Sequence, residues 1–172
     1  MKTIDFITQL QAKMGGEIDY KDMVRFRETV KGIPRLLLDF DGNHVRFEIQ
    51  NQTELVLNVY QVPPHQLKIY HENFATKILD KLHLHSEVKI GDQEFDAKYI
   101  IEFTTPEKAQ ATITPQFKEA LLNLEPFKLF EMKKRDYILL KNINNSYDLN
   151  DAERDILNMV KIVQNCDQVW KG

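Results

Sequence analysis

Cysteine, glycine, proline and long apolar runs are all scarce in this sequence, and each scarcity excludes a class of protein. The single cysteine, Cys166, cannot form an internal disulfide, so a disulfide-rich secreted scaffold is excluded and a reducing compartment is favoured. No apolar run approaches the ~20 residues that span a bilayer, and Met1 to Gly15 lacks the basic-then-apolar order of a signal peptide. We therefore expect a soluble, cytoplasmic protein without a membrane span.

Positive charge is not in excess either, because the formal net charge is -3. Proteins that bind a phosphate backbone normally carry a clustered excess of Lys and Arg. The basic cluster Lys133 to Arg135 is short and is followed directly by Asp136, which is typical of a solvated turn. We therefore expect no nucleic-acid partner.

What the sequence does contain is the composition of a globular protein, with 42% hydrophobic and 28% charged residues in a chain of 172. This length favours a single α+β domain over residues 1–172. Apolar residues at helical spacing predict a first amphipathic helix from Thr3 to Met14, ended by Gly15-Gly16. Residues 17–32 have mixed periodicity, which leaves helix and strand both open.

The middle of the chain has the pattern of strands. Arg35 to Phe40 and Val45 to Ile49 flank the turn residues Asp41-Gly42-Asn43, which predicts a β-hairpin. Leu55 to Tyr60 and Leu67 to Tyr70 flank a proline pair, which predicts a second strand pair with a rigid connection. An antiparallel meander follows from these four strands.

The segment from Phe95 to Phe103 shows the clearest alternation in the chain. Successive side chains of a strand point to opposite faces, so every second residue of this segment is expected to face the core. Those residues are Phe95, Ala97, Tyr99, Ile101 and Phe103. Asp96, Lys98 and Glu102 would face water, and Asp92 or Asp96 would cap local backbone N–H groups.

Helical signals surround this segment. Phe74 to Leu82 has the spacing of a short helix, and Thr105-Pro106 and Thr114-Pro115 each combine a capping residue with proline at the first helical position. Asn150 with Glu153 predicts a capping box for a terminal helix. Its apolar stripe is Ala152, Ile156, Met159, Val160, Val163 and Cys166.

A final hairpin is predicted from Phe127 to Met132 and from Tyr137 to Leu140, on either side of the charged tip. Together these elements predict an α+β fold: a single domain with a mainly antiparallel, twisted sheet, helices packed on one side and a C-terminal helix.

The order of these motifs resembles an uncharacterised bacterial family of unknown function. The resemblance covers roughly residues 67–140 and is carried by Gly91-Asp92-x-Glu94-Phe95-Asp96, Thr105-Pro106-Glu107, Thr114-Pro115 and Leu121-Leu122-x-Leu124. In that family, strands lead to a Gly-Asp-x-x-Phe-Asp segment, a helical pair and a closing hairpin, often behind membrane-spanning helices. The resemblance implies the fold and provides no catalytic residues, and this chain departs from it in lacking a membrane span.

Two clusters could in principle hold a metal. Asp92, Glu94 and Asp96 alternate as at the start of a calcium loop, but Ala97 and Phe103 stand where that loop needs glycine and glutamate. His83 and His85, with His71 nearby, share a face only if the backbone is extended, and no cysteine or second histidine pair completes a set in sequence. We therefore expect no metal and no cofactor, and His71, His83 and His85 stay as the metal candidates.

Nucleophilic catalysis has little support in the residues. Ser86 and Ser146 lack the glycine-flanked elbow of a nucleophile, and Cys166 lies on an apolar helix stripe, where thiols are inert. No glycine-rich phosphate loop is present. No catalytic residue is therefore assigned.

Aromatic residues are the remaining candidates for a binding site, with 10 Phe and 6 Tyr mostly in predicted strands. Tyr60 and Tyr70 could line a concave sheet surface, so they are the predicted ligand-binding residues. We expect a non-catalytic ligand-binding or protein-interaction module whose partner is a protein or a small molecule, or a second copy of the chain in a homodimer. The alternative is an enzyme whose site combines histidines and carboxylates, or a metal, from distant positions.

Overall fold

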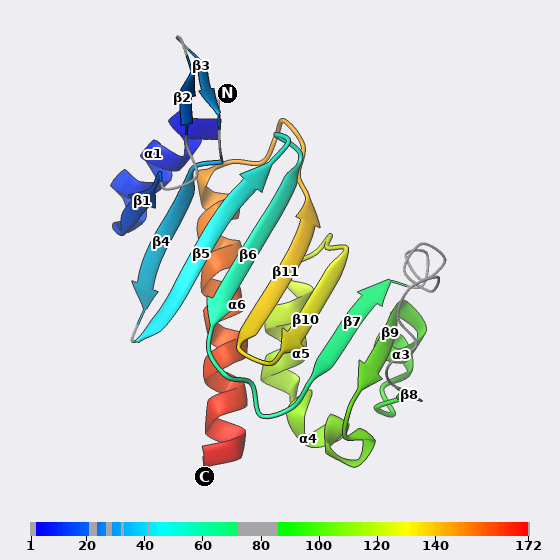
Figure 1. The fold of residues 1–172 in the computed structure, drawn as a ribbon. Coiled ribbons are helices and arrows are strands. Elements are labelled where there is room, and N and C mark those ends of the chain that lie inside the picture. Colours follow the sequence, from blue (N-terminus) through cyan, green and yellow to red (C-terminus); the bar gives the residue numbers. More distant parts are fainter. Residues whose placement is uncertain are drawn as a thin grey trace.

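An antiparallel sheet forms the centre of the computed structural model, and the helices pack against one of its faces (Figure 1). The structure describes residues 3–20, 24–26, 29–31, 33–40, 42–71 and 86–171. The helices are α1 (Thr3–Met14), α3 (Gln93–Lys98), the 3-10 turn η1 (Pro106–Lys108), α4 (Ala109–Thr112), α5 (Pro115–Leu122) and α6 (Leu149–Lys171). The strands of the sheet are β1 (Glu17–Asp19), β4 (Arg35–Phe40), β5 (Asn43–Gln50), β6 (Glu54–Tyr60), β7 (Leu67–His71), β8 (Ser86–Glu87), β9 (Tyr99–Phe103), β10 (Leu129–Lys133) and β11 (Asp136–Asn142).

Over the described residues the strand order is β1-β4-β5-β6-β11-β10-β7-β9-β8, and neighbouring strands are antiparallel. β2 (Val24–Phe26) and β3 (Thr29–Lys31) pair as a separate two-stranded antiparallel sheet, inside the segment that the sequence left open. The predicted hairpin of β4 and β5 is confirmed, with Leu38 opposite Val45. The predicted fold class is confirmed as well.

The predicted pairing of the next two strands is wrong. β6 and β7 do not pair with each other, because the β10–β11 hairpin lies between them in the sheet (Figure 1). Their connection, residues 61–66, contains Pro63 and Pro64 and is too long and too rigid for a tight hairpin turn. After β6 the chain therefore skips the two positions that β11 and β10 occupy and re-enters the sheet as β7.

The strand predicted from Phe95 to Phe103 is half wrong. Its first part is helix α3, because Asp92 accepts a hydrogen bond from the backbone N–H of Phe95 at 3.1 Å and so caps a helix. Phe95 is still buried, since a spacing of four residues keeps it on the same side as Tyr99 in a helix as well as in a strand. Ala97, expected inside, is exposed.

The second part, β9, follows the predicted alternation with one exception. Tyr99, Ile101 and Phe103 are buried as expected. Glu102, which was expected to face water, is buried as well, and its carboxylate accepts a hydrogen bond from the hydroxyl of Tyr70 at 2.6 Å.

The cap of the terminal helix α6 lies two residues before the predicted one. Instead of Asn150 with Glu153, Asp148 accepts from the backbone N–H groups of Asn150 at 2.7 Å and Asp151 at 3.0 Å. The Asp151 carboxylate in turn accepts from the N–H of Asp148 at 3.1 Å, which completes a capping box. The six predicted stripe residues are all buried, so the interior face of α6 is confirmed.

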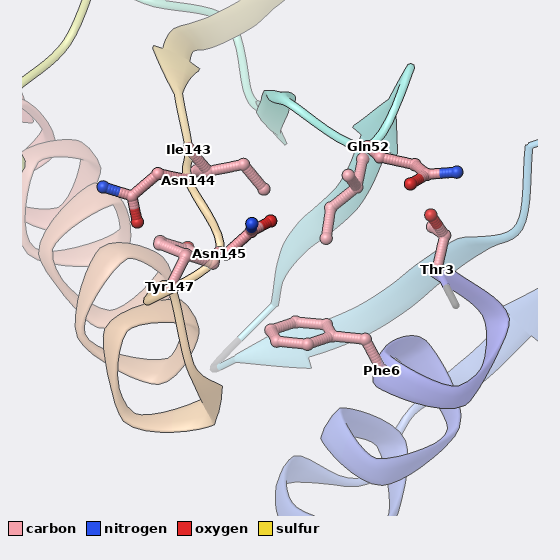
Figure 2. A pocket seen from close by; sticks show the side chains of 8 residues that line it. Thr3, Phe6, Gln52, Ile143, Asn144, Asn145 and Tyr147 are labelled. Carbon is pink, nitrogen blue, oxygen red and sulfur yellow. The ribbon is translucent and has the colours of Figure 1, made fainter. Parts of the chain in front are cut away.

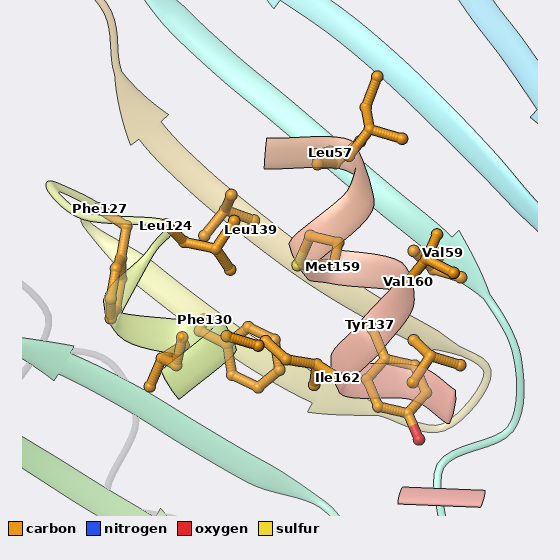
Figure 3. Packing of buried hydrophobic residues seen from close by; sticks show 14 of the residues in the cluster. Leu57, Val59, Leu124, Phe127, Phe130, Tyr137, Leu139, Met159, Val160 and Ile162 are labelled. Carbon is orange, nitrogen blue, oxygen red and sulfur yellow. The ribbon is translucent and has the colours of Figure 1, made fainter. Parts of the chain in front are cut away.

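The buried apolar residues form one cluster that includes residues from Phe6 to Cys166. Figure 3 shows Met159 and Val160 of α6 packed over Leu57, Val59 and Leu139 of the sheet. Full burial of such a side chain contributes about 1.5–3 kcal/mol relative to exposure, so this contact holds the helix layer to the sheet.

The other helices can be compared with the glycine and capping residues that predicted their ends. Helix α1 has its predicted bounds, and the glycine after it is required, since a Cβ at Gly16 would lie 2.3 Å from the carbonyl oxygen of Leu37. Thr114 caps α5 by accepting from the N–H of Phe117 at 3.1 Å, as predicted, whereas Thr105 makes no side-chain cap. The helix predicted from Phe74 to Leu82 lies outside the described residues.

Candidate functional site

The two tyrosines predicted to bind a ligand are not brought together. Tyr60 on β6 is 39% exposed, and its ring centre lies 5.6 Å from the guanidinium carbon of Arg46. Tyr70 on β7 is 2% exposed and donates its hydroxyl hydrogen bond to Glu102, and burial together with that carboxylate raises the pKa of Tyr70. Because β11 and β10 lie between their strands, the two rings are not neighbours in the sheet.

The three histidine candidates are divided between described and undescribed parts of the chain. His83 and His85 lie outside the described residues. His71, at the end of β7, places Nε2 3.0 Å from Oε1 of Glu125. No group of three His, Cys, Asp or Glu side chains that could hold a metal occurs within the described ranges.

Glu125 is the centre of a polar cluster that the sequence did not reveal. Besides His71, its carboxylate accepts a hydrogen bond from the hydroxyl of Tyr99 and pairs with the ammonium group of Lys98 at 3.2 Å. The Tyr99 ring also lies 4.9 Å from the His71 ring and stacks on Phe127 at 5.6 Å. The cluster therefore joins β7, α3 and β9 to the segment that follows α5.

The electrostatics of this cluster stabilise the ionised carboxylate. Burial alone would raise the pKa of Glu125, but the hydrogen bonds from Tyr99, His71 and Lys98 outweigh it and lower that pKa. Burial, and then the contact with Glu125, raise the pKa of Tyr99. A carboxylate whose pKa is lowered and a phenol whose pKa is raised are poorly suited to exchange a proton with each other near neutral pH.

A cavity of about 460 Å³ adjoins this cluster, between α3 and α5. We call it the α3–α5 cavity. Its lining residues are Asp92, Glu94, Phe95, Lys98, Tyr99, Pro115, Lys118, Glu119 and Leu122. Leu122, a large apolar residue of this lining, is 44% exposed.

Two helix caps determine the shape of the α3–α5 cavity. Asp92 begins α3 and also accepts a hydrogen bond from the ammonium group of Lys118 on α5 at 2.5 Å, so it ties the two helices together. The hydrogen bond from Lys118, and then that from the N–H of Phe95, lower the pKa of Asp92. Pro115 stands at the first turn of α5, after the Thr114 cap.

The charges around the α3–α5 cavity are only partly compensated. Lys98 pairs with Glu125, and Lys118 pairs with Asp92. Glu94 and Glu119 make no side-chain hydrogen bond or ion pair within the part of the chain that the structure describes. The rim is therefore acidic around an apolar interior that includes Phe95 and Leu122.

The sequence contained the signals for both caps but not for the cavity. Thr114-Pro115 predicts the start of α5, and Asp92 was expected to cap local N–H groups, as observed. Because Phe95 to Lys98 was assigned to a strand, no second helix wall was expected beside α5. Glu125 has no motif around it, and its contact with His71 depends on strand pairing far along the chain.

Comparisons with known proteins identify a fold relative but no family. No protein-family model matches the sequence, and no curated protein matches it. Among solved structures, the chain is similar to a mycobacterial trehalose monomycolate transport factor A, with a TM-score of 0.64 and 9% sequence identity. The similarity covers 96% of this chain and 94% of that chain, and at this identity it shows a shared fold.

Each helix of the described residues, including the long helix α6, is too short or too polar to cross a bilayer.

Proposed function

We propose that the protein is a non-catalytic binding module and that the α3–α5 cavity holds the apolar part of its ligand. The observation that carries this proposal is the exposure of Leu122, which is 44%, at a cavity of about 460 Å³ that also contains Phe95 and Tyr99. Cavities of roughly 300–1,000 Å³ with mainly apolar walls and a few polar groups are typical of ligand sites. The rings are held firmly, because Tyr99 stacks on Phe127 and lies 4.6 Å from the Phe95 ring.

The acidic rim narrows the class of ligand. Glu94 and Glu119 are the two rim carboxylates without a partner among the described side chains. An anionic ligand would meet their repulsion, whereas a neutral or cationic one would not. We therefore expect a ligand with an apolar body and no net negative charge, either a small molecule or a segment of a partner protein.

Among the described residues, two candidate nucleophiles have properties that favour a non-catalytic role. Cys166 lies on the buried face of α6, and burial raises the pKa of its thiol to about 12. The Tyr99 hydroxyl at the cavity is kept protonated by burial and by Glu125. Neither group is therefore a competent nucleophile near neutral pH.

The fold relative supports the same class of function. A protein described as a transport factor shares this fold, which favours a role in holding or passing on a ligand over a chemical step. The single buried cysteine supports a reducing compartment, for which we propose the cytoplasm. The resemblance to the bacterial family with the Gly-Asp-x-x-Phe-Asp segment remains part of this proposal.

The test is a fluorescence titration with N-phenyl-1-naphthylamine, a neutral apolar probe. The wild type is expected to bind it saturably, and Leu122→Glu is expected to weaken binding by about tenfold or more, equivalent to about 1.4 kcal/mol. Leu157→Glu is the matched control, because Leu157 is a similarly exposed leucine on α6 that does not line the α3–α5 cavity. Equal affinity for the two variants would overturn the proposal.

The enzyme alternative retains one observation, the contact of His71 with Glu125 beside the α3–α5 cavity. An enzyme acting through this pair would convert a ligand captured from a bacterial extract, and His71→Gln would abolish conversion while binding persisted. A binding module would release the same ligand unchanged from both proteins. Mass spectrometry of the bound and released ligand distinguishes these outcomes.

A further inference from the structure

A second pocket, of about 240 Å³, lies at the N-terminal end of α1 and differs in chemistry from the α3–α5 cavity. We call it the α1 pocket. It is enclosed by α1, by the turn between β5 and β6, and by the segment between β11 and α6 (Figure 2). Its lining residues are Thr3, Phe6, Ile49, Gln52, Ile143, Asn144, Asn145 and Tyr147.

None of the side chains that line the α1 pocket is charged, although 28% of the residues in the chain are. A buried ion pair adjoins the pocket through Tyr147, and in it the ammonium group of Lys141 lies 2.8 Å from Oδ2 of Asp155. Their side chains are 4% and 0% exposed, and the hydroxyl of Tyr147 donates to the same Asp155 oxygen at 2.9 Å. These charges satisfy each other, so a charged ligand in the pocket would lose hydration without gaining a partner.

The polar groups of the α1 pocket are neutral and available. The amides of Gln52 and Asn145 and the hydroxyl of Thr3 make no hydrogen bond to any other described residue, whereas Oδ1 of Asn144 is already used by Ser146. Figure 2 shows Asn145 on one side of the pocket and Gln52 with Thr3 on the other. Amides and hydroxyls both donate and accept hydrogen bonds, which matches a ligand whose own groups do both.

The floor of the α1 pocket is aromatic and rigid. Phe6 stacks on Phe47 at 6.3 Å and on Tyr147 at 6.1 Å, so its ring is held from two sides. A flat apolar floor beneath a ring of neutral hydrogen-bonding groups fits a molecule with an apolar face and a polar edge.

The turn that presents Gln52 has an unfavourable backbone. Asn51 and Gln52 have φ angles of 49° and 63°, in the left-handed region that favours glycine. Asparagine tolerates this region of φ, but glutamine is disfavoured in it. A side chain retained at the cost of backbone strain beside a pocket is consistent with a binding role for that side chain.

We propose that the α1 pocket binds a neutral sugar unit. A sugar ring combines hydroxyl groups that donate and accept with C–H faces that pack on aromatic rings, and it has no charge. The volume of about 240 Å³ lies below the range of drug-sized ligands, so one unit fits rather than a chain. The proposal goes beyond the proposed function, because it concerns a different pocket and a different ligand.

The test is a titration of the isotope-labelled full chain with the methyl glycosides of glucose, galactose and mannose. Backbone amide NMR spectra monitor the binding. At least one of these glycosides is expected to shift the amides of Gln52 and of residues 143–147, with a Kd of about 1–10 mM. Glucosamine and glucuronate are the charged counterparts and are expected to bind at least about threefold more weakly. Absence of saturable shifts with all three neutral glycosides, or equal binding of the charged sugars, would overturn the proposal.

Variants distinguish the loss of a ligand contact from the loss of the fold. Asn145→Ala and Gln52→Gly are each expected to weaken the sugar by about fivefold or more, since each removes one amide partner. Glycine relieves the positive φ, so Gln52→Gly is expected to keep or raise the melting temperature, which rules out unfolding as the cause. Gln168→Ala, an exposed amide outside the α1 pocket, is the matched control and is expected to bind as the wild type does. Wild-type affinity in both pocket variants would contradict the proposal.

Discussion

The α3–α5 cavity and the α1 pocket differ in where they keep their charges. Five of the nine residues that line the α3–α5 cavity are charged, and none of the eight that line the α1 pocket is. Beside the α1 pocket the charges are present but buried, as the pair of Lys141 and Asp155. The two sites therefore differ in how deeply the nearby charges are buried, and the ligands proposed for them differ accordingly.

Each site is supported by a similar group of residues. At the α3–α5 cavity, the Glu125 carboxylate accepts from Tyr99 and pairs with Lys98. Beside the α1 pocket, the Asp155 carboxylate accepts from Tyr147 and pairs with Lys141. A carboxylate, a phenol and an ammonium group meet in both places.

Burial gives the two carboxylates opposite properties. Glu125 is 20% exposed, and its hydrogen bonds lower its pKa against the effect of burial. Asp155 is 0% exposed, and burial raises its pKa even though Lys141 and Tyr147 oppose that effect. The same three chemical groups therefore form a stabilised anion at one site and a costly buried ion pair at the other.

Removing Asp155 is expected to have the largest effect on the fold. Asp155→Ala leaves the Lys141 ammonium buried without a counter-charge, which is expected to lower the free energy of unfolding by about 3–5 kcal/mol. Urea denaturation followed by circular dichroism measures this loss. The double variant Lys141→Met/Asp155→Leu removes both charges and is expected to lie within about 1 kcal/mol of the wild type or above it. If the double variant were as unstable as Asp155→Ala, the loss could not be explained by an unpaired Lys141 charge, and the ion pair itself would be needed for stability.

Removing Glu125 is expected to have an intermediate effect. Glu125→Ala leaves the buried Tyr99 hydroxyl and His71 without their acceptor, at an expected cost of about 1–3 kcal/mol in unfolding free energy. Since the folded pKa of Glu125 is lowered, its contribution is present above the unfolded pKa of about 4.5 and is lost as the pH falls through the folded value. Urea denaturation of both proteins from pH 7 to pH 3 is therefore expected to show a shrinking difference, and a constant difference would contradict the assignment.

Removing the Thr114 cap tests whether the α3–α5 cavity depends on α5. Thr114→Ala deletes the acceptor for the N–H of Phe117 and the hydrogen bond to Asn165, with an expected loss of about 1 kcal/mol in unfolding free energy. The apolar probe is expected to bind more weakly, while sugar binding at the α1 pocket stays the same. Thr114→Ser keeps the hydroxyl and serves as the control in thermal melts and titrations.

Changing Leu122 is expected to have the smallest effect on stability. Leu122→Glu replaces an exposed residue that packs little, so the free energy of unfolding is expected to change by less than about 0.5 kcal/mol. Its loss of probe binding would then be separate from any loss of fold. A change above about 2 kcal/mol in urea denaturation would mean that Leu122 belongs to the core rather than to a binding surface.

Much of the fold followed from local signals in the sequence. The bounds of α1, the hairpin of β4 and β5, the Thr114 cap and the apolar stripe of α6 all depend on residues within a few positions of one another. Such signals act before the chain is compact, so periodicity and capping chemistry predict them. The misassigned α3 marks the limit, because Phe95 and Tyr99 are four residues apart and both a strand and a helix place them on one side.

The sites depend on contacts that no local signal records. His71 and Glu125 are 54 residues apart and meet because β7 pairs with β10. Asn145 and Gln52 meet at the α1 pocket because β6 pairs with β11. The predicted ligand-binding pair, Tyr60 and Tyr70, was close in sequence, but the strand order places two strands between them.

The position of the β10–β11 hairpin has a consequence for how the chain is made. β6 and β7 end by residue 71, but both must wait for strands that begin at residue 129 to fill the space between them. Until residues 129–142 have been synthesised, β6 and β7 each lack a neighbour of the finished sheet, and open strand edges are templates for pairing with other chains. Late closure of this kind slows folding, because distant segments must meet before the sheet is continuous.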